Sequence, residues 1–282
     1  WGNLGWMSGK ENKMNCEICS FENPKGSVTG VILKDNKLLL LRRNEEPFKG
    51  MWDLPGGYMN KEETPKQAIK REIKEELCFW PKGVTFMDSV AGTGVWRDNK
   101  FPVIPHFYLI DHGDEEIKLN KENSEFEWVS LKDITIDQIA WDSNQKFVSW
   151  LQLDFKFDIQ RIRELVKQLD NTAEVNEQNL YKANINGYIA KRYNSDLLLV
   201  GFGCIFIRQT ILRKQAVIED MIVDENYRGK GYGSRILGSL LDWAKANGVE
   251  VVELTTNSKR IAAHGLYEKF GFKVHETDHM LL

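Results

Sequence analysis

Short apolar runs separated by polar turns dominate the first half of the chain, with one longer helical pattern among them. Residues 28–33 and 38–41 are apolar and flank Asp35-Asn36, a pair typical of a tight hairpin turn. Residues 65–77 place apolar side chains at intervals of three and four, which is the period of an amphipathic helix. Further strand patterns lie at 84–90, 103–110 and 126–129. This half is therefore predicted to be an α+β sandwich.

A change of pattern near residue 148 indicates a second domain. Residues 142–145 are polar, and Leu151, Leu153, Phe155 and Phe157 then alternate with polar residues as a first strand would. The elements predicted beyond this point are helices at 159–169, at 234–246 and up to Gly271, and strands at 197–208, 216–223 and 249–255. We therefore expect a tail at 1–26, one domain at 27–148 and an α/β domain at 149–282.

Charge and cysteine content narrow the classes of partner. The formal net charge of -3 provides no overall positive field, so neither nucleic acid nor an anionic membrane is expected as a partner. No apolar run approaches the roughly 20 residues that span a bilayer. The four cysteines are too scattered for a disulfide framework, which favours reduced thiols and a cytoplasmic location. The oligomeric state stays open.

Carboxylates gather on one face of the helix predicted at 65–77. Glu72, Glu75 and Glu76 stand at i, i+3 and i+4 and share an arc of roughly 100°. Like charges at this spacing destabilise a helix by a few tenths of a kcal/mol per pair unless a cation lies among them. A hard divalent cation, Mg²⁺ or Mn²⁺, would use such oxygens together with substrate phosphates. For the bare spacing alone, a solvated helix face is the alternative.

The wider pattern around these carboxylates is more specific. The residues that fit G-x5-E-x7-R-E-U-x-E-E, where U is a bulky aliphatic residue, are Gly57, Glu63, Arg71, Glu72, Ile73, Glu75 and Glu76. Together with the preceding Leu-Pro-Gly-Gly at 54–57, this stretch resembles the Nudix hydrolases over about residues 27–142. The resemblance implies an α/β/α Nudix sandwich with a mixed sheet. It also implies a Mg²⁺-dependent hydrolase in which water attacks a phosphorus of a nucleoside-diphosphate-linked compound.

The same resemblance assigns roles to individual residues. The carbonyl of Gly56 and the carboxylates of Glu72, Glu75 and Glu76 would bind the metal. Glu72 and Glu76 are the candidate catalytic residues, and the base would be Glu72 or a glutamate outside the motif. Arg71 and Glu63 would orient the loop and the helix. Cys78 replaces the family's glycine, which predicts a changed helix exit.

The substrate and the tail remain open at this point. ADP-ribose, a nucleotide sugar and a nucleoside triphosphate all fit the motif. The side chains that could bind phosphate or a base, or could simply pack, are Arg42, Arg43, Arg97, Phe48, Trp52 and Trp96. Cys16 and Cys19 resemble half of a zinc ribbon, but a structural zinc needs four ligands, so two free thiols are expected.

A second glycine-rich loop follows a predicted strand and opens a predicted helix. It reads Arg228-Gly229-Lys230-Gly231-Tyr232-Gly233. Backbone N–H groups at a helix start bind anions such as pyrophosphate without any net protein charge. A surface turn is the plain alternative. A dinucleotide-binding loop is a weaker one, because its third glycine would be Ser234.

This loop, the later Asn257 and the Leu-Tyr-Glu-Lys-Phe-Gly-Phe run at 266–272 resemble the GNAT N-acetyltransferases over residues 155–282. The resemblance implies an α/β GNAT fold, acetyl-CoA as cofactor and an amine as acceptor. The amides of residues 228–233 would hold the CoA pyrophosphate, while Val223 and Asn257 would contact the pantetheine arm. Tyr267 would protonate the departing thiolate. Glu219 is the candidate base for the amine, with an ordinary surface carboxylate as the alternative.

Two readings of the whole chain therefore remain. In the first, the chain is a bifunctional enzyme with a Nudix hydrolase and an N-acetyltransferase. In the second, a single domain is catalytic, and the other is a nucleotide- or CoA-binding regulatory module.

Overall fold

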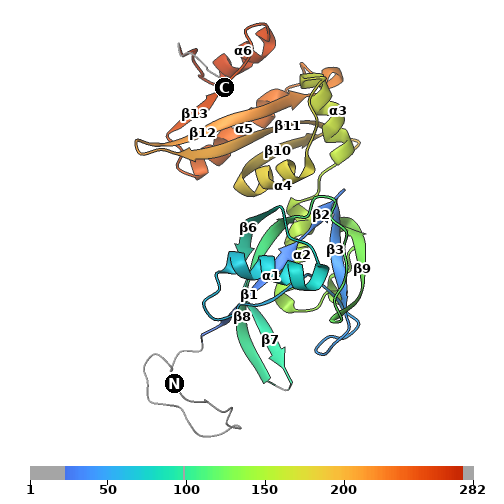
Figure 1. Cartoon of the computed structure of the whole chain (residues 1–282). Helices are drawn as coiled ribbons and strands as arrows, with labels where there is room; N and C mark the ends of the chain where they lie inside the picture. The colour runs from blue at the N-terminus through green and yellow to red at the C-terminus, as the bar shows by residue number, and fades with distance from the viewer. Residues whose placement is uncertain (1–22, 98, 276–282) are drawn as a thin grey trace. The chain divides into compact units, whose positions relative to one another are not determined.

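The computed structural model describes residues 23–97 and 99–275, which form two compact units (Figure 1). The first unit contains the described residues up to Leu33 together with Lys37–Leu151. The second contains Lys34–Asn36 and the described residues from Gln152 onward. The first mixes two sheets with helices and the second is an α/β unit, as predicted. Cys16 and Cys19 lie outside the described residues.

Two sheets form the body of the first unit. The first has the order β5-β1-β8-β6, with β7 paired to β8. Its strands are β1 (Lys25–Val31), β5 (Gly56–Tyr58), β6 (Gly83–Ser89), β7 (Gly92–Trp96) and β8 (Asn99–Asp111). The strands of the second sheet are β2 (Leu33–Lys34), β3 (Lys37–Arg43), β4 (Trp52–Asp53) and β9 (Asn123–Ser130). Asp35 and Asn36 have φ of 51° and 57°, which confirms the hairpin turn.

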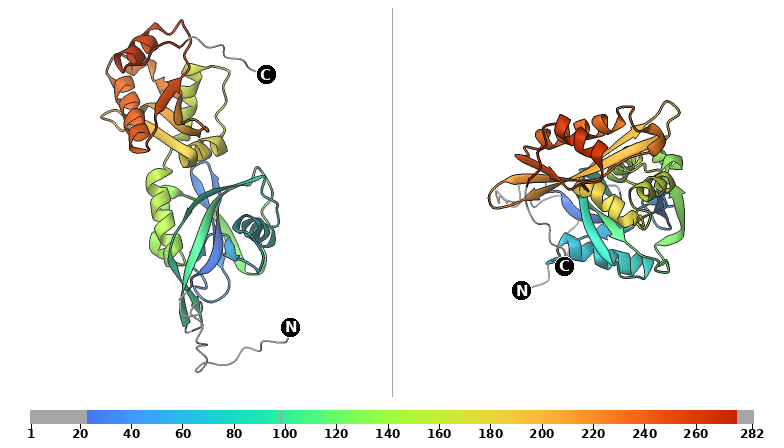
Figure 2. Two further views of the ribbon diagram at one scale, coloured as in Figure 1. Left: turned by 90° about the vertical axis from the view of Figure 1, so that its left-hand side faces the viewer. Right: turned by 90° about the horizontal axis from the view of Figure 1, so that it is seen from above.

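Helices α1 (Pro65–Leu77) and α2 (Asp142–Asp154) flank these sheets in Figure 2. The apolar stripe of α1 is fully buried against β1, β3 and β8 in one core cluster. Burying one such aliphatic side chain contributes roughly 1.5–3 kcal/mol. On α2, the ring of Phe147 stacks on Phe107 of β8 with centroids 3.8 Å apart. The two helices therefore fix the sheets from two sides.

The strand predicted from Leu151, Leu153, Phe155 and Phe157 is wrong. Leu151 and Leu153 lie in α2, and the polar residues 142–145 are its first turn. The buried residues Phe147, Val148 and Leu151 follow a helical spacing, whereas Leu153 is exposed. Phe155 and Phe157 lie in the coil after the helix, where both side chains are buried.

One four-stranded sheet forms the centre of the second unit, in the order β10-β11-β12-β13. Its strands are β10 (Gly187–Tyr193), β11 (Leu199–Gln209), β12 (Lys214–Val223) and β13 (Val251–Leu254). The parallel pairing of β12 with β13 ends at Ile218 and Leu254, while β12 continues to Val223. The last five residues of β12 therefore extend beyond its pairing with β13.

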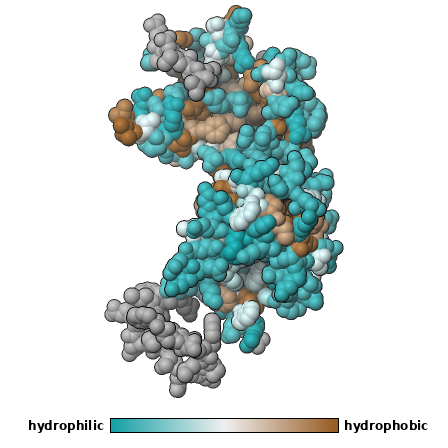
Figure 3. All heavy atoms as spheres, in the orientation of Figure 1, coloured by the Kyte–Doolittle hydropathy of each residue, from teal (hydrophilic) through white to brown (hydrophobic). Residues whose placement is uncertain are grey.

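Four helices pack against this sheet. Helices α5 (Tyr232–Ala246) and α6 (Ile261–Lys269) share one apolar core with β11 and β12, and α3 (Ile159–Leu169) and α4 (Glu177–Asn186) lie on the other face (Figure 2). The sequence pattern did not predict α4 or β10. Exposed apolar side chains gather at the end of the β11–β12 hairpin, where Ile211 and Leu212 lie (Figure 3). Within the described ranges, no helix has both the length and the apolar composition required to cross a bilayer.

Candidate active sites

Helix α1, which carries the carboxylates, has well-defined ends. Thr64 and Gln67 form a reciprocal capping box at its start, with Pro65 in the first turn. At its end Cys78 adopts a left-handed conformation with φ of 62°, and Lys74 Nζ donates to the Cys78 carbonyl at 2.9 Å. The prediction that Cys78 changes the helix exit is therefore wrong, because the cysteine adopts the left-handed conformation that glycine commonly adopts at the end of a helix. That conformation costs a non-glycine residue roughly 1–2 kcal/mol.

Arg71 organises the carboxylates of this region. Its Nε and Nη2 donate to the two oxygens of Glu63, each at 2.9 Å. Its Nη1 donates to Glu72 at 2.8 Å and to Glu75 at 3.0 Å, and its Nη2 also donates to the Tyr58 carbonyl at 3.1 Å. Since Glu72 and Glu75 share one nitrogen, their carboxylates converge on one side of α1. Hydrogen bonding to Arg71 lowers the pKa of Glu63 below its usual value.

Two carboxylates of the cluster are buried. Glu72 and Glu76 are 9% and 7% exposed, whereas more than half of the Glu75 side chain is exposed. Burial raises the pKa of Glu76 well above its usual value, and the charges of Glu72, Asp53 and Glu122 raise it further. Burial also raises the pKa of Glu72, against the opposing effect of Arg71. The site therefore concentrates negative charge that a cation would stabilise.

Two glycines allow the loop to approach these carboxylates. Gly56 has a φ of 153°, and a Cβ there would lie 2.1 Å from the Val28 carbonyl oxygen. A Cβ on Gly57 would lie 2.5 Å from Glu72 Oε1. The Gly56 N–H donates to Glu76 Oε2 at 3.3 Å. The loop backbone therefore lies directly against both buried carboxylates.

The donor set fits a hard divalent cation, although the side chains do not form a ready-made cage. Across residues 23–97 and 99–275, no three Asp, Glu, His or Cys side chains converge tightly enough to hold a metal. Glu72 and Glu75 instead contact Arg71. Carboxylate oxygens such as those of the buried Glu72 and Glu76 are nonetheless ligands that Mg²⁺ and Mn²⁺ prefer. Binding would require Glu75 and Glu72 to turn partly away from Arg71.

Sequence reasoning missed two acidic residues beside this cluster. Asp53 is buried on β4, and Glu122 is exposed in the loop before β9, yet both act electrostatically on Glu76. Glu122 is therefore a candidate for the glutamate outside the motif, and its role as base stays a prediction. No sequence signal distinguishes it from Glu125 or Glu127, because only the fold brings its loop to α1.

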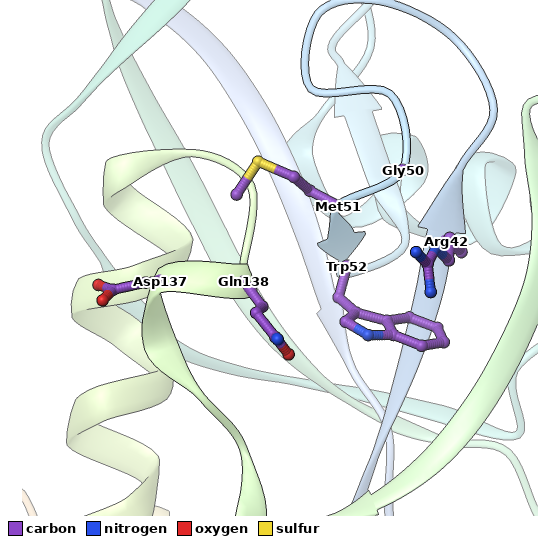
Figure 4. Close-up of a pocket in the computed structure, with 6 residues that line it drawn as sticks. All are labelled: Arg42, Gly50, Met51, Trp52, Asp137 and Gln138. Carbon is purple, nitrogen blue, oxygen red and sulfur yellow. The ribbon is translucent and has the colours of Figure 1, made fainter.

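The side chains considered for substrate binding are dispersed. Arg42 and Trp52 line a cavity of about 430 Å³ together with Gly50, Met51, Asp137 and Gln138 (Figure 4). The Arg42 guanidinium lies 5.3 Å from the Trp52 ring. Arg43 instead pairs with Asp53, and Phe48 packs edge-on against Trp141. Trp96 is exposed on β7, followed by Arg97 with φ of 54°.

The second glycine-rich loop connects β12 to α5 through a short 3₁₀ turn, η4 (Glu225–Tyr227). Gly229 and Gly231 have φ of 75° and 78°, and among the described residues no atom beyond the immediate chain neighbours lies within 4 Å of a Cβ built on either. Gly231 is the N-cap of α5 and provides no side-chain cap. Open space therefore adjoins uncapped helix amides, which is the arrangement expected of an anion site.

The cationic side chains of this loop fold back on it. Arg228 Nε donates to the Val223 carbonyl at 3.1 Å. Lys230 Nζ donates to the Asn226 carbonyl at 3.1 Å and lies 4.8 Å from the Tyr227 ring. Both cations thus stay beside the loop amides.

The remaining predicted residues of the second unit lie on β12 and around α6. Val223 ends β12 beside the start of α5, where a Cβ on Gly233 would lie 3.8 Å from Val223 Cγ2. Tyr267 is half-buried with its hydroxyl 3.9 Å from Met221 Sδ on β12, and burial raises the pKa of its phenol. Glu219 is exposed on β12 opposite Cys204.

Asn257 is exposed in the turn before α6, and it contacts residues of that turn and of α6. Its side-chain oxygen accepts from the Lys259 N–H at 2.9 Å, and its carbonyl accepts from the Arg260 N–H at 2.9 Å. The structure therefore brings Val223 and Tyr267 to the loop end of β12, and it places Asn257 at the opening of α6.

Asp224 is a further residue that the sequence did not single out. It is buried, and its carboxylate accepts from Arg161 on α3 and from the Asn226 N–H. Burial alone would raise the pKa of Asp224, but the hydrogen bonds from Asn226 and Arg161 lower it below its usual value. Asp224 thus ties the glycine-rich loop to α3.

Comparisons with known proteins match both halves. The NUDIX domain family model matches residues 24–151, and the acetyltransferase (GNAT) family model matches residues 144–272. An ADP-ribose pyrophosphatase of Methanocaldococcus jannaschii is 36% identical over 43% of this chain and 69% of its own length. The nucleoside triphosphatase NudI of Escherichia coli is 30% identical over 38% of this chain and 82% of its own length.

For the second half, the uncharacterised N-acetyltransferase YobR of Bacillus subtilis is 40% identical over 20% of this chain and 22% of its own length. These matches follow the order of the two motifs along the sequence. The chain belongs to the Nudix hydrolases through its first domain and carries a GNAT-family N-acetyltransferase domain after it.

Proposed function

We propose that the first domain hydrolyses the diphosphate linkage of a nucleoside-diphosphate compound with the help of Mg²⁺ or Mn²⁺. The observation that carries this proposal is the pair of buried carboxylates, Glu72 and Glu76, against the Gly56 loop. When bound, the cation would neutralise phosphate charge and lower the pKa of a water molecule.

The residues of the site then have distinct tasks. Glu72, Glu75 and Glu76 would hold the cation together with the Gly56 carbonyl, and Arg71 would orient the first two of these carboxylates. Glu122, which is exposed beside the cluster, or Glu72 would accept the proton of the attacking water. The water oxygen forms a bond to phosphorus, the bond from phosphorus to the bridging oxygen breaks, and the leaving phosphate takes the electron pair.

ADP-ribose is the first substrate to test, because the 36% identical relative is an ADP-ribose pyrophosphatase. Nucleoside triphosphates are the second class to test, because the 30% identical relative NudI is named a nucleoside triphosphatase. The test measures phosphate and nucleotide release from a panel of both classes with Mg²⁺ or Mn²⁺, for the wild type and for Glu76→Gln.

The matched control is Glu116→Gln, because Glu116 is an exposed glutamate of the same domain that pairs with Lys118. We expect Glu76→Gln to lose hydrolysis and the control to retain it. Equal activity of wild type and Glu76→Gln would refute the assignment.

We propose that the second domain transfers an acetyl group from acetyl-CoA to an amine. The observation that carries this is the open space beside Gly229 and Gly231 at the uncapped start of α5. The loop amides would bind the CoA pyrophosphate, and Val223 and Asn257 would contact the pantetheine arm.

In the transfer itself, the amine nitrogen forms a bond to the acetyl carbon and the carbon–sulfur bond breaks. Glu219 would take the proton from the amine, directly or through water. Tyr267 would donate its proton to the thiolate. The raised pKa of Tyr267 keeps the phenol protonated and ready to donate at neutral pH.

Titration calorimetry with acetyl-CoA and thiol release with a panel of amines test this proposal. Tyr267→Phe should slow thiol release without weakening acetyl-CoA binding, and Tyr193→Phe, on exposed Tyr193 of β10, is the matched control. A wild type that binds no acetyl-CoA would contradict it.

Both activities in one chain make the protein bifunctional. Each substitution should therefore spare the other activity, and loss of both from one substitution would favour the regulatory reading.

The free thiols of Cys78 and Cys204 support a reducing, cytoplasmic location.

A further inference from the structure

Asp53 is a buried carboxylate surrounded by hydrogen-bond donors. Its Oδ1 accepts from the Leu54 N–H and from Asn144 Nδ2, each at 2.8 Å. Its Oδ2 accepts from Arg43 Nη1 at 2.9 Å and from Trp141 Nε1 at 3.0 Å. Burial raises the pKa of Asp53, and the donors Arg43, Leu54 and Trp141 oppose that effect, as a buried charge requires.

These donors come from three separate parts of the fold. Arg43 ends β3, Trp141 and Asn144 lie at the start of α2, and Leu54 begins the loop that leads to Gly56. The connection to α2 is reinforced by the Ala140 N–H, which donates to the Trp52 carbonyl at 2.7 Å. Asp53 therefore fixes the point at which the loop leaves β4.

The loop is held at its other side as well. The Gly30 N–H of β1 donates to the Pro55 carbonyl at 2.7 Å, directly before Gly56. With both sides of the loop fixed, the Gly56 N–H donates to Glu76, and Gly57 lies against the Glu72 carboxylate. The charge of Asp53 also acts on Glu76 across the same space.

We propose that Asp53 is a positioning residue of the hydrolase site, which holds the Leu54-Pro55-Gly56 loop against Glu76 and adds negative charge to the carboxylates that attract the cation. This inference rests on the hydrolase function proposed above. Groups that orient metal ligands in this way typically change metal affinity or activity by roughly 10–100-fold when removed.

The test is Mn²⁺ binding by the full chain, followed by the electron paramagnetic resonance of free Mn²⁺, without any substrate. Asp53→Asn should weaken Mn²⁺ binding by roughly 10–100-fold. In hydrolysis at saturating Mn²⁺ it should lower kcat more than it raises KM. Trp141→Phe, which removes one donor and keeps an aromatic ring beside Phe48, should have a smaller effect in the same direction.

Phe107→Leu separates positioning from stability. Phe107 stacks on Phe147 in the core and makes none of the hydrogen bonds to Asp53. This variant should lower the melting temperature and leave Mn²⁺ affinity unchanged. If Asp53→Asn does not fold, Trp141→Phe and Asn144→Ala provide the same comparison.

Mn²⁺ affinity that stays at the wild-type value in the Asp53 and Trp141 variants, whatever their melting temperatures, would overturn the role of Asp53. A wild type that neither binds Mn²⁺ nor hydrolyses a diphosphate would instead overturn the proposed function. The two failures are therefore distinguishable.

Discussion

Glu76→Gln should make the metal-free protein more stable while it abolishes hydrolysis. Glu76 is 7% exposed, and its surroundings disfavour its charge, since burial and the three acidic neighbours Glu72, Asp53 and Glu122 all raise its pKa. Glutamine has the same shape and can still accept the Gly56 N–H, while its amide can donate to a neighbouring carboxylate. The substitution therefore removes a buried charge without leaving a cavity.

The expected gain follows from the cost of a poorly compensated buried group, which is about 1–3 kcal/mol. For a domain of this size, that corresponds to a rise in melting temperature of roughly 4–12 °C. Binding of a ligand to the folded state adds RT ln(1 + [L]/Kd), so Mn²⁺ should stabilise the wild type more than the variant. The difference between the melting temperatures of the variant and the wild type should then become smaller or change sign as Mn²⁺ is added.

Differential scanning calorimetry in EDTA, and then across a Mn²⁺ titration, measures both effects. The transition that responds to Mn²⁺ identifies the hydrolase domain, and the acetyltransferase transition is the internal control. Two results would refute the reasoning: a Glu76→Gln variant that melts below the wild type in EDTA, or one that Mn²⁺ stabilises as much as it stabilises the wild type.

Three further substitutions test separate contacts. Cys78→Gly should stabilise the hydrolase domain by about 0.5–1 kcal/mol in urea unfolding. Glycine removes the steric strain of the left-handed conformation, and this gain exceeds the extra conformational entropy that glycine loses on folding. A loss of stability would contradict this prediction. Arg71→Lys should lower kcat for hydrolysis by roughly 10–100-fold, since an ammonium cannot replace the guanidinium contacts with Glu63; unchanged kinetics would count against it. Asp224→Asn should destabilise the acetyltransferase domain at neutral pH. Because the folded state holds the pKa of Asp224 below its usual value, this difference in stability should be fully present above that usual value and should shrink as the pH falls through the folded pKa. A difference in stability that does not depend on pH would exclude an ionic contribution.

Local sequence signals were sufficient for the elements that are capped and periodic. Helix α1 was predicted with its observed bounds because its apolar stripe has a helical period and Pro65 opens its first turn. The hairpin at Asp35-Asn36 and the glycine-rich start of α5 carry comparable signals, since positive φ favours these residue types.

The misread segments carry competing signals. The start of α2 is polar because its side chains bond to neighbouring segments: Asn144 donates to Asp53, Asp142 accepts from the Thr93 N–H, and Gln145 donates to the Ile139 carbonyl. Its first turn therefore resembles a linker in the sequence. Leu151 to Phe157 alternate in sequence, but the end of a helix and a buried coil produce the same spacing.

The parts of the sites that depend on tertiary contacts could not be read from the sequence. Glu72, Glu75 and Glu76 were found because they share one helix, while Asp53 and Glu122 reach the cluster only through the fold. In the second domain, the partner of Asp224 is Arg161, which lies 63 residues away along the chain. The metal-binding and catalytic assignments stay predictions.

An anomalous-difference map from crystals soaked in Mn²⁺ tests the central claim most directly. The account predicts a peak bound by Glu72, Glu76 and the Gly56 carbonyl, with Glu75 turned from Arg71 toward the metal. Mn²⁺-dependent hydrolysis together with a peak elsewhere, and with the contacts of Arg71 to Glu72 and Glu75 unchanged, would contradict it.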